Sequence, residues 1–296
     1  MKQSLDHLPD DSKIIIDRVL TSVLKNCHPE KVVLFGSRAT DKWLSDMQAA
    51  QISLSPYIGD YDFFIVAKPG EKIPEDAVIS GIGDNYQTPS ENIITILSHD
   101  IIYLNNQLSK GQFFFSEIIT EGILLYDAGT IELAAVGPTN WEETVLQAEQ
   151  DLNIWLDDAQ SFFSGAKFFL NESKLRISLF CLHQAAESTY SALVLIHRGY
   201  KSKTHNLRLL YKKTKSISEK LAAVFSFSSE SDWHLLELLR RGYIEARYDK
   251  EFVVTGEQLT ILQEKISRLI TITESICRAK IELLKRTYNG KIADNS

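Results

Sequence analysis

Two stretches of the sequence decide the fold, VVLFGSRAT at residues 32–40 and GDYDFFIV at residues 59–66. Each holds a short apolar run rich in β-branched or aromatic residues, which predicts a buried strand. In the first stretch the run ends at Gly36, where a turn leads toward a helix. In the second stretch the strand starts from a pair of aspartates. The sequence therefore predicts a glycine turn and an acid pair at the ends of two buried strands.

The segments around these strands predict a small α/β or α+β sheet domain. Apolar residues recur every three to four positions from 12 to 26, which is helical spacing. Two more β-rich runs predict strands at 92–97 and 122–127, and the stretch between them, 107–120, is predicted as helix or loop. Strands that alternate with helical patterns indicate a sheet flanked by helices.

The pattern changes near Gly137-Pro138, where we predict the boundary between a domain at 1–137 and a second at 138–296. The 296-residue length also favours two domains. The second half is predicted as an all-α antiparallel bundle, because it holds only long amphipathic periods, with Gly165 near the end of the first. These periods cover residues 141–163, 174–198, 204–224, 231–247 and 257–288.

Charge is divided unevenly along the chain, whose formal net charge is −7. Residues 1–140 hold 10 Lys and Arg against 19 Asp and Glu, whereas residues 141–296 hold 22 against 20. Within the second half, 198–220 carries eight basic residues and a single acid, Glu219, and so predicts a local positive surface. This surface is interpreted as a solvated face, a docking face for the acidic half, or a phosphate contact.

The cysteines and the apolar stretches of the sequence indicate where in the cell the protein is located. Cys27, Cys181 and Cys277 are odd in number and far apart, so neither a disulfide framework nor a zinc cluster is indicated. The N-terminus lacks the apolar core of a signal peptide, and no stretch has the length of a membrane span. We therefore expect a cytoplasmic protein with no membrane partner.

The glycine turn and the acid pair together suggest phosphate chemistry. Gly36 and Ser37 bring backbone N–H groups to one point, with no Cβ at Gly36 to block a phosphate. Asp60 and Asp62 point to the same face of their strand. Two clustered carboxylates need a cation, and their hard oxygens suit magnesium. A phosphate-binding turn beside a pair of metal-binding carboxylates is typical of phosphoryl or nucleotidyl transfer.

These residues resemble the minimal nucleotidyltransferases of the DNA polymerase β superfold, over about residues 14–128. The resemblance implies an α+β fold with a small mixed sheet. It implies that Gly36 and Ser37 hold the nucleoside triphosphate and that Arg38 supports its phosphates. It also implies that Asp60 and Asp62 are catalytic and bind two Mg²⁺ ions.

Two features depart from that family. The link at 41–59 is longer than usual and predicts an inserted segment over the site. The family also places a third acid on a later strand, but the run at 92–97 has none. Asp100 after it and Glu91 before it are the alternatives, and a chain with neither in place would bind nucleotide with weak turnover.

Residues 140–290 resemble the HEPN domain, a helical module that often accompanies minimal nucleotidyltransferases. The matching motifs are HQAAE at 183–187 and Y-x-x-A-R-Y, which contains Tyr243, Arg247 and Tyr248. These three residues are predicted to bind nucleotide or a partner's backbone. The resemblance also implies a homodimer formed through the helical domain.

Some members of the HEPN family are ribonucleases that use an Arg and a His four to six residues apart. No His follows Arg247 within that distance, and the other pair, Arg198 and His205, straddles a turn between helices. A capping or packing role is the alternative for His205. His183, on an apolar helix face, is predicted to be a core or interface histidine.

The leading functional prediction is a Mg²⁺-dependent nucleotidyltransferase domain fused to a HEPN-type domain. It would transfer a nucleoside monophosphate from ATP or another triphosphate to a hydroxyl of a small molecule, a protein or an RNA. The alternatives are a catalytically weak nucleotide-binding or regulatory protein, and a toxin–antitoxin fusion whose helical half cuts RNA.

Overall fold

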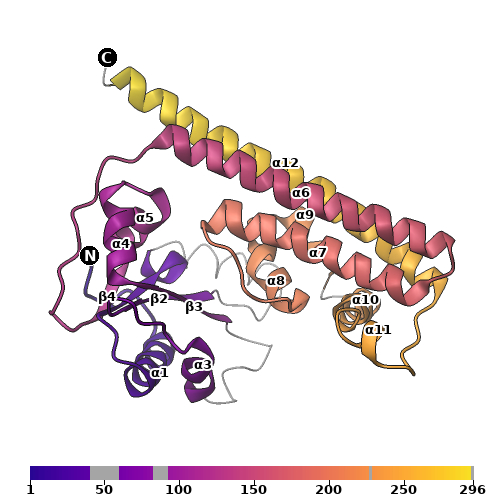
Figure 1. Ribbon diagram of the computed structural model, residues 1–296, viewed down its shortest axis with the longest axis horizontal. Helices are drawn as coiled ribbons and strands as arrows, with labels where there is room; N and C mark the ends of the chain where they lie inside the picture. Colours follow the sequence, from indigo (N-terminus) through magenta and orange to yellow (C-terminus); the bar gives the residue numbers. More distant parts are fainter. Residues whose placement is uncertain (41–59, 83–92, 227–228, 295–296) are drawn as a thin grey trace. The chain divides into compact units, whose positions relative to one another are not determined.

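A computed structural model describes residues 1–40, 60–82, 93–226 and 229–294 (Figure 1). The chain forms two compact units, Met1–Asn140 and Trp141–Ser296, which we call the sheet unit and the helical unit. Among the helices of the described residues, none is both long and apolar enough to cross a membrane. All three cysteines are free thiols.

The sheet unit contains a four-stranded mixed sheet in the order β3-β2-β1-β4. Strand β1 is antiparallel to both neighbours, and β2 is parallel to β3. The predicted α+β class with a small mixed sheet is thus confirmed. The stretch left open as helix or loop contains the end of α4, a short turn at 110–112 and most of α5. The elements are α1 (Asp10–Asn26), β1 (Lys31–Phe35), η1 (Gly36–Ala39), β2 (Asp60–Ala67), α3 (Glu75–Ile82), β3 (Ile93–Asp100), α4 (Ile101–Ser109), α5 (Phe113–Glu121) and β4 (Ile123–Asp127).

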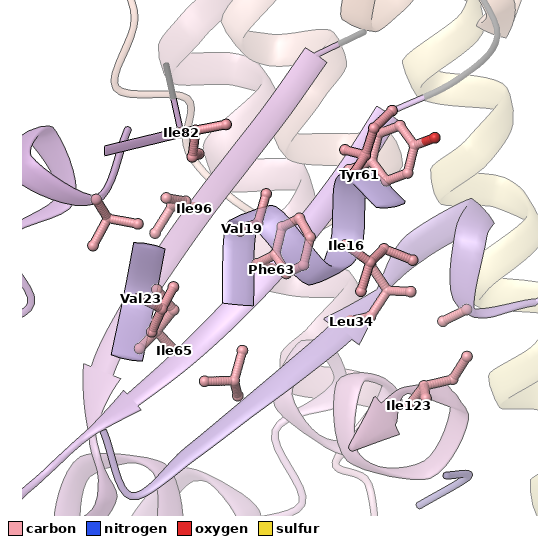
Figure 2. Close-up of a cluster of buried hydrophobic side chains, with 14 of the residues drawn as sticks. Ile16, Val19, Val23, Leu34, Tyr61, Phe63, Ile65, Ile82, Ile96 and Ile123 are labelled. Atoms are coloured by element: carbon pink, nitrogen blue, oxygen red, sulfur yellow. The ribbon is translucent and has the colours of Figure 1, made fainter. Parts of the chain in front are cut away.

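Helices α1 and α3 pack on one face of the sheet (Figure 2). Helix α1 starts after Pro9, with Asp10 and Asp11 in its first turn, where acids interact favourably with the helix dipole. Its apolar residues at intervals of three and four then lie on the face that meets the alternate residues of β2. The buried contacts include Ile16, Val19, Val23, Phe63 and Ile65.

The other face of the sheet packs on α5 through aromatic side chains. Phe35 of β1 meets Phe114 at 6.0 Å between ring centroids, and Phe64 of β2 meets Phe115 at 5.8 Å. Side chains alternate along a strand, so Asp60 and Asp62 share the face of Phe64. The acid pair therefore lies at the start of β2, on the face opposite α1.

Three long helices dominate the helical unit, α6, α7 and α12, which pack against one another. In α7, Leu179, Leu182 and Ala186 are fully buried, whereas Leu175 is half-buried. The elements are α6 (Trp141–Asn171), α7 (Leu175–Arg198), α8 (Leu207–Thr214), η3 (Lys215–Ile217), α9 (Glu219–Ala222), α10 (Glu230–Arg241), α11 (Glu245–Tyr248) and α12 (Gly256–Asp294).

Two predicted helices are each divided in the structure. The period at 204–224 breaks at Ser218, whose backbone is extended and whose side chain caps α9 by accepting a hydrogen bond from the Lys220 N–H. The period at 231–247 breaks at Gly242, where a Cβ would lie 2.8 Å from Cγ of Leu179. Local capping and close packing on α7 therefore override the amphipathic pattern.

The predicted helix end near Gly165 is wrong, because α6 continues to Asn171. A Cβ at Gly165 would meet only Sγ of Cys181, at an ordinary 3.8 Å, so this glycine neither ends the helix nor is required by packing. The chain turns instead at Ser173, which adopts a positive φ of 58°.

Candidate functional site

The predicted acid pair lies at the edge of the sheet where β1 ends and β2 begins. Asp62 is level with Phe35, the last residue of β1, and Asp60 is the first residue of β2. Both aspartates are only 1% exposed. The antiparallel pairing of β1 with β2 thus carries the turn after Phe35 to the level of the acid pair.

Gly36 makes the closest approach to these carboxylates. It has a φ of +75°, and a Cβ built on it would lie 2.6 Å from Oδ2 of Asp62. No side chain fits in that space without moving the buried carboxylate. The backbone then enters η1, in which Ser37 is half-buried and its carbonyl accepts a hydrogen bond from the Thr40 N–H at 3.3 Å. The structure therefore brings the predicted glycine turn and Asp62 together.

Arg38, the residue after Ser37 in η1, is buried in the sheet unit. Its guanidinium is 1% exposed, donates to Oγ of Ser12 at 3.1 Å and stacks over the Tyr61 ring at 4.6 Å. Tyr61 alternates with Asp60 and Asp62 along β2 and so faces α1. The Arg38 side chain therefore joins η1 to the core under α1, and its support of substrate phosphates stays a prediction.

A third acid on β3 is also not where the family pattern requires it. The residue level with Asp62 is Thr95, and Asp100 is level with Ala67, about 16 Å further along the strand at roughly 3.3 Å per residue. Asp100 instead caps α4, accepting a hydrogen bond from the Tyr103 N–H at 2.9 Å. Asp100 is thus excluded as the third acid by the strand register.

The other predicted features of this edge, Glu91 and the link at 41–59, lie outside the described residues. Within the described residues, no group of three or more His, Cys, Asp or Glu side chains is arranged to hold a metal ion. Among the described residues at this edge, Asp60 and Asp62 offer two buried carboxylates beside the backbone turn at Gly36. This donor set fits an oxygen-preferring divalent cation whose remaining ligands come from water or substrate phosphates.

In the helical unit, the structure brings Tyr243, Arg247 and Tyr248 together, as the motif predicted. The Nε–H of Arg247 donates to the Tyr243 carbonyl at 2.6 Å. Its guanidinium carbon lies 4.7 Å from the Tyr243 ring centroid, 5.0 Å from that of Tyr248 and 4.8 Å from that of Phe180. Arg247 and Tyr248 are both exposed, so a preoriented cation and an aromatic ring face solvent.

The ring of Tyr243 is already packed by protein groups. The imidazoles of His183 and His205 lie nearly parallel to it, at centroid distances of 5.0 Å and 5.2 Å. With Arg247 also stacked on it, the Tyr243 ring contacts three protein side chains, and its binding of nucleotide stays a prediction.

Glu187 links these two histidines and was not singled out from the sequence. Its Oε1 accepts from Nδ1 of His205 at 2.8 Å, and its Oε2 lies 3.4 Å from Nε2 of His183. Burial raises the pKa of Glu187, but hydrogen bonds from the two histidines outweigh burial and leave that pKa below its ordinary value. The i, i+4 spacing of His183 and Glu187 within HQAAE was the available signal.

The alternative capping role of His205 is wrong, because Asn206 is the N-cap of α8 and accepts from the Arg208 N–H at 3.0 Å. Arg198, the other member of the sequence pair, donates to the Lys213 carbonyl at 2.8 Å.

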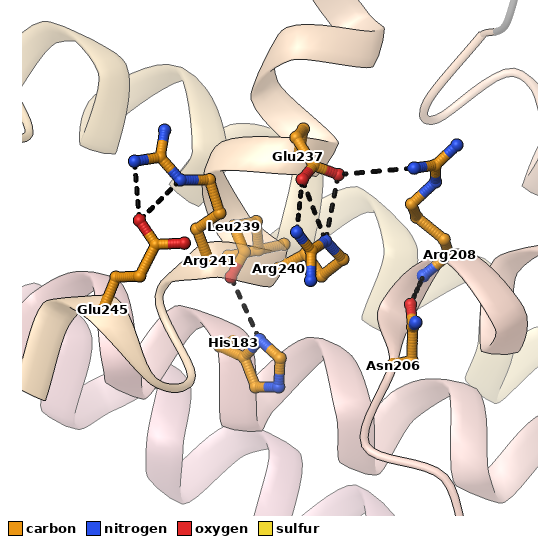
Figure 3. A network of polar contacts seen from close by, with 8 residues as sticks. All are labelled: His183, Asn206, Arg208, Glu237, Leu239, Arg240, Arg241 and Glu245. Carbon is orange, nitrogen blue, oxygen red and sulfur yellow. Dashed lines mark hydrogen bonds and ion pairs between the residues drawn. The ribbon is translucent and has the colours of Figure 1, made fainter.

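The positive charge near α8 and α10 is partly neutralised by acids (Figure 3). Glu237 pairs with Arg240 and lies 3.9 Å from Arg208, and Arg241 pairs with Glu245. The hydrogen bond from Arg240 is the main reason that the pKa of Glu237 is lowered. These arginines are therefore committed to intramolecular pairs, unlike Arg247.

Comparison with known families supports the interpretation of the helical unit. The family model of the HEPN domain matches residues 152–284. This confirms the HEPN resemblance, which was predicted for about residues 140–290. No curated protein matches the chain. The nucleotidyltransferase resemblance of the sheet unit stays a prediction.

Proposed function

We propose that this protein is a Mg²⁺-dependent nucleotidyltransferase that transfers a nucleoside monophosphate from ATP or another triphosphate to a hydroxyl acceptor. The observation that carries the proposal is the approach of Gly36 to Asp62, in which a Cβ would lie 2.6 Å from the carboxylate oxygen. A backbone turn without a side chain, held against a buried acid, lets a phosphate chain approach the point where a cation is needed.

In this proposal Asp60 and Asp62 hold the divalent cation. When bound, the ion supplies charge neutralisation for the triphosphate. The Gly36 turn admits the phosphates, and the Ser37 hydroxyl is available to donate to a phosphate oxygen. The buried, packed position of β2 keeps the two carboxylates oriented before substrate arrives.

The acceptor class stays open among a small molecule, a protein and an RNA. The HEPN-type helical unit is proposed to contribute acceptor binding or homodimer formation. The exposed Arg247 and Tyr248 are its best described candidates for contacting a phosphate and a planar group.

The test is the release of labelled pyrophosphate from ATP and the other triphosphates in the presence of Mg²⁺ and pooled acceptors. Asp62→Asn removes the charge at nearly constant volume, and Asp76→Asn is the matched control because Asp76 is an exposed acid in the first turn of α3. We expect wild type and Asp76→Asn to be equally active and Asp62→Asn to lose on the order of 100-fold or more.

Two outcomes decide against this proposal. Equal activity of Asp62→Asn and wild type would remove the acid pair from the reaction. Mg²⁺-dependent nucleotide binding that is lost in Asp62→Asn, but without turnover on any acceptor, would support the alternative of a regulatory nucleotide-binding protein.

A second candidate function, cleavage of RNA by the helical unit, is favoured by the contact of Glu187 with His205. A carboxylate that accepts from Nδ1 orients an imidazole and leaves Nε2 for proton transfer. His205 is 58% exposed, and Arg247 stacks on the same tyrosine as His205. The expected result is RNA cleavage that survives Asp62→Asn and is lost in His205→Ala, and RNA left intact by the wild type refutes this candidate.

A further inference from the structure

The imidazole of His183 is held in one orientation at the centre of the helical unit. The residue is fully buried, and its Nδ1 lies 3.0 Å from the carbonyl oxygen of Leu239 at the end of α10 (Figure 3). A carbonyl oxygen can only accept a hydrogen bond, so Nδ1 must carry a proton. This contact therefore fixes the state of one of the two ring nitrogens.

The other ring nitrogen of His183 faces a carboxylate. Its Nε2 lies 3.4 Å from Oε2 of Glu187, one helical turn further along α7. In the neutral ring with its proton on Nδ1, Nε2 bears a lone pair, and an ionised carboxylate has only lone pairs to offer. Both atoms are buried, and neither has a hydrogen-bond partner within the described part of the chain. A neutral His183 would thus place two buried acceptors against each other, an arrangement that folded proteins avoid.

Within the described residues, no second donor reaches these two atoms. Glu187 has its other oxygen, Oε1, occupied by Nδ1 of His205. Arg247 stacks on Tyr243, as both histidines do, but its Nε–H is already donated to the Tyr243 carbonyl. The hydrogen bond from Nδ1 of His205 favours the ionised form of Glu187. A proton on Nε2 of His183 is therefore the simplest way to satisfy both buried atoms.

We propose that a proton on Nε2 of His183 bridges to Oε2 of Glu187, so that His183 is a buried imidazolium. This cation fixes Glu187 as the carboxylate that orients His205. The contacts then run in order from the Leu239 carbonyl to His183, from His183 to Glu187 and from Glu187 to His205. The Nε2 atom of His205 takes no part in this series of contacts. His183 is a positioning residue that acts through Glu187. The inference deepens the second candidate function, because His205 is the acid–base residue of that candidate.

The experiment is NMR of the full-length protein with isotopically labelled histidine, which distinguishes protonated from unprotonated ring nitrogens. At neutral pH we expect both ring nitrogens of His183 to carry a proton in the wild type. In Glu187→Gln, the amide NH₂ can donate to Nε2, so His183 is expected to become neutral and to keep its proton on Nδ1. Glu237→Gln is the matched control, because it neutralises an acid of the same unit that pairs with arginines instead.

His205→Ala removes the outer histidine and leaves the contact between His183 and Glu187 in place. His183 should therefore stay doubly protonated in this variant, which also provides a second measurement should Glu187→Gln fold poorly. An unprotonated Nε2 of His183 in the wild type overturns the inference, as does a His183 spectrum that is the same in wild type and Glu187→Gln. Absence of RNA cleavage with His183 doubly protonated refutes the second candidate function and leaves this inference standing.

Discussion

Replacing Gly36 by alanine tests the contact on which the proposed function rests. Gly36 has a φ of +75°, and the left-handed region costs a residue with a Cβ roughly 1–2 kcal/mol. The new methyl group would also lie 2.6 Å from Oδ2 of Asp62, which is 1% exposed and cannot swing into solvent. Overpacking of this kind costs about 1–3 kcal/mol. We therefore expect Gly36→Ala to lower the free energy of unfolding of the sheet unit by about 2–5 kcal/mol.

Gly70→Ala is the matched control. Gly70 has nearly the same φ, +73°, but a Cβ there would meet no atom within 4 Å. Gly70→Ala should therefore lower the free energy of unfolding by only about 1–2 kcal/mol, the conformational cost of a Cβ in the left-handed region. The difference between the two variants therefore isolates the close approach of the turn to the carboxylate.

Hydrogen exchange of the β1 and β2 amides is the suitable assay, because it reports the stability of the sheet separately from that of the helical unit. Calorimetry with Mg²⁺ and ATP, at a temperature where both variants are folded, gives the nucleotide affinity. We expect Gly36→Ala to lose at least about tenfold in affinity, equivalent to 1.4 kcal/mol, and Gly70→Ala to be unchanged. Equal stability and equal affinity in the two variants would refute the reasoning.

Three further substitutions test the sheet unit. Arg38→Met should lower the free energy of unfolding by about 1–3 kcal/mol, measured by denaturant titration, and leave nucleotide affinity unchanged; lost affinity at unchanged stability would restore a phosphate contact for Arg38. Thr95→Asp places a third carboxylate level with Asp62 and should raise Mg²⁺ affinity in calorimetry, whereas unchanged affinity would separate Thr95 from the site. Asp127→Asn removes the partner of the buried Lys31, whose hydrogen bond is the main cause of the lowered pKa of Asp127. Because that pKa is depressed in the folded state, the stabilisation is present above the unfolded pKa and is lost as the pH falls through the folded pKa. The stability difference between wild type and Asp127→Asn should therefore shrink below about pH 4 in unfolding measurements, and a difference independent of pH would contradict this assignment.

Much of the architecture could be predicted from residue order, because strand and helix patterns are local. The apolar runs ending at Gly36 and beginning at Asp60 are strands in the structure, and the helical pattern of 12–26 is α1. The convergence of Gly36 on Asp62 also follows from simple pairing, since an antiparallel neighbour brings the end of one strand beside the start of the next. The helix breaks at Ser218 and Gly242 were not predicted, because the amphipathic pattern continues through both residues. The break at Ser218 depends on local capping, and the break at Gly242 depends on close packing against α7.

The sequence by itself determined the acid pair, the glycine turn, the change from sheet to helices and the motif that contains Arg247. Only the tertiary structure decided which neighbours these groups meet. Arg38 lies beside the turn in sequence, yet its side chain packs under α1 with Tyr61, and strand register places Asp100 at the wrong end of β3. The chain from His183 through Glu187 to His205 joins α7 to a loop 18 residues beyond Glu187. Periodicity shows which face a side chain occupies, whereas register and helix packing, which are long-range, decide what that face contacts.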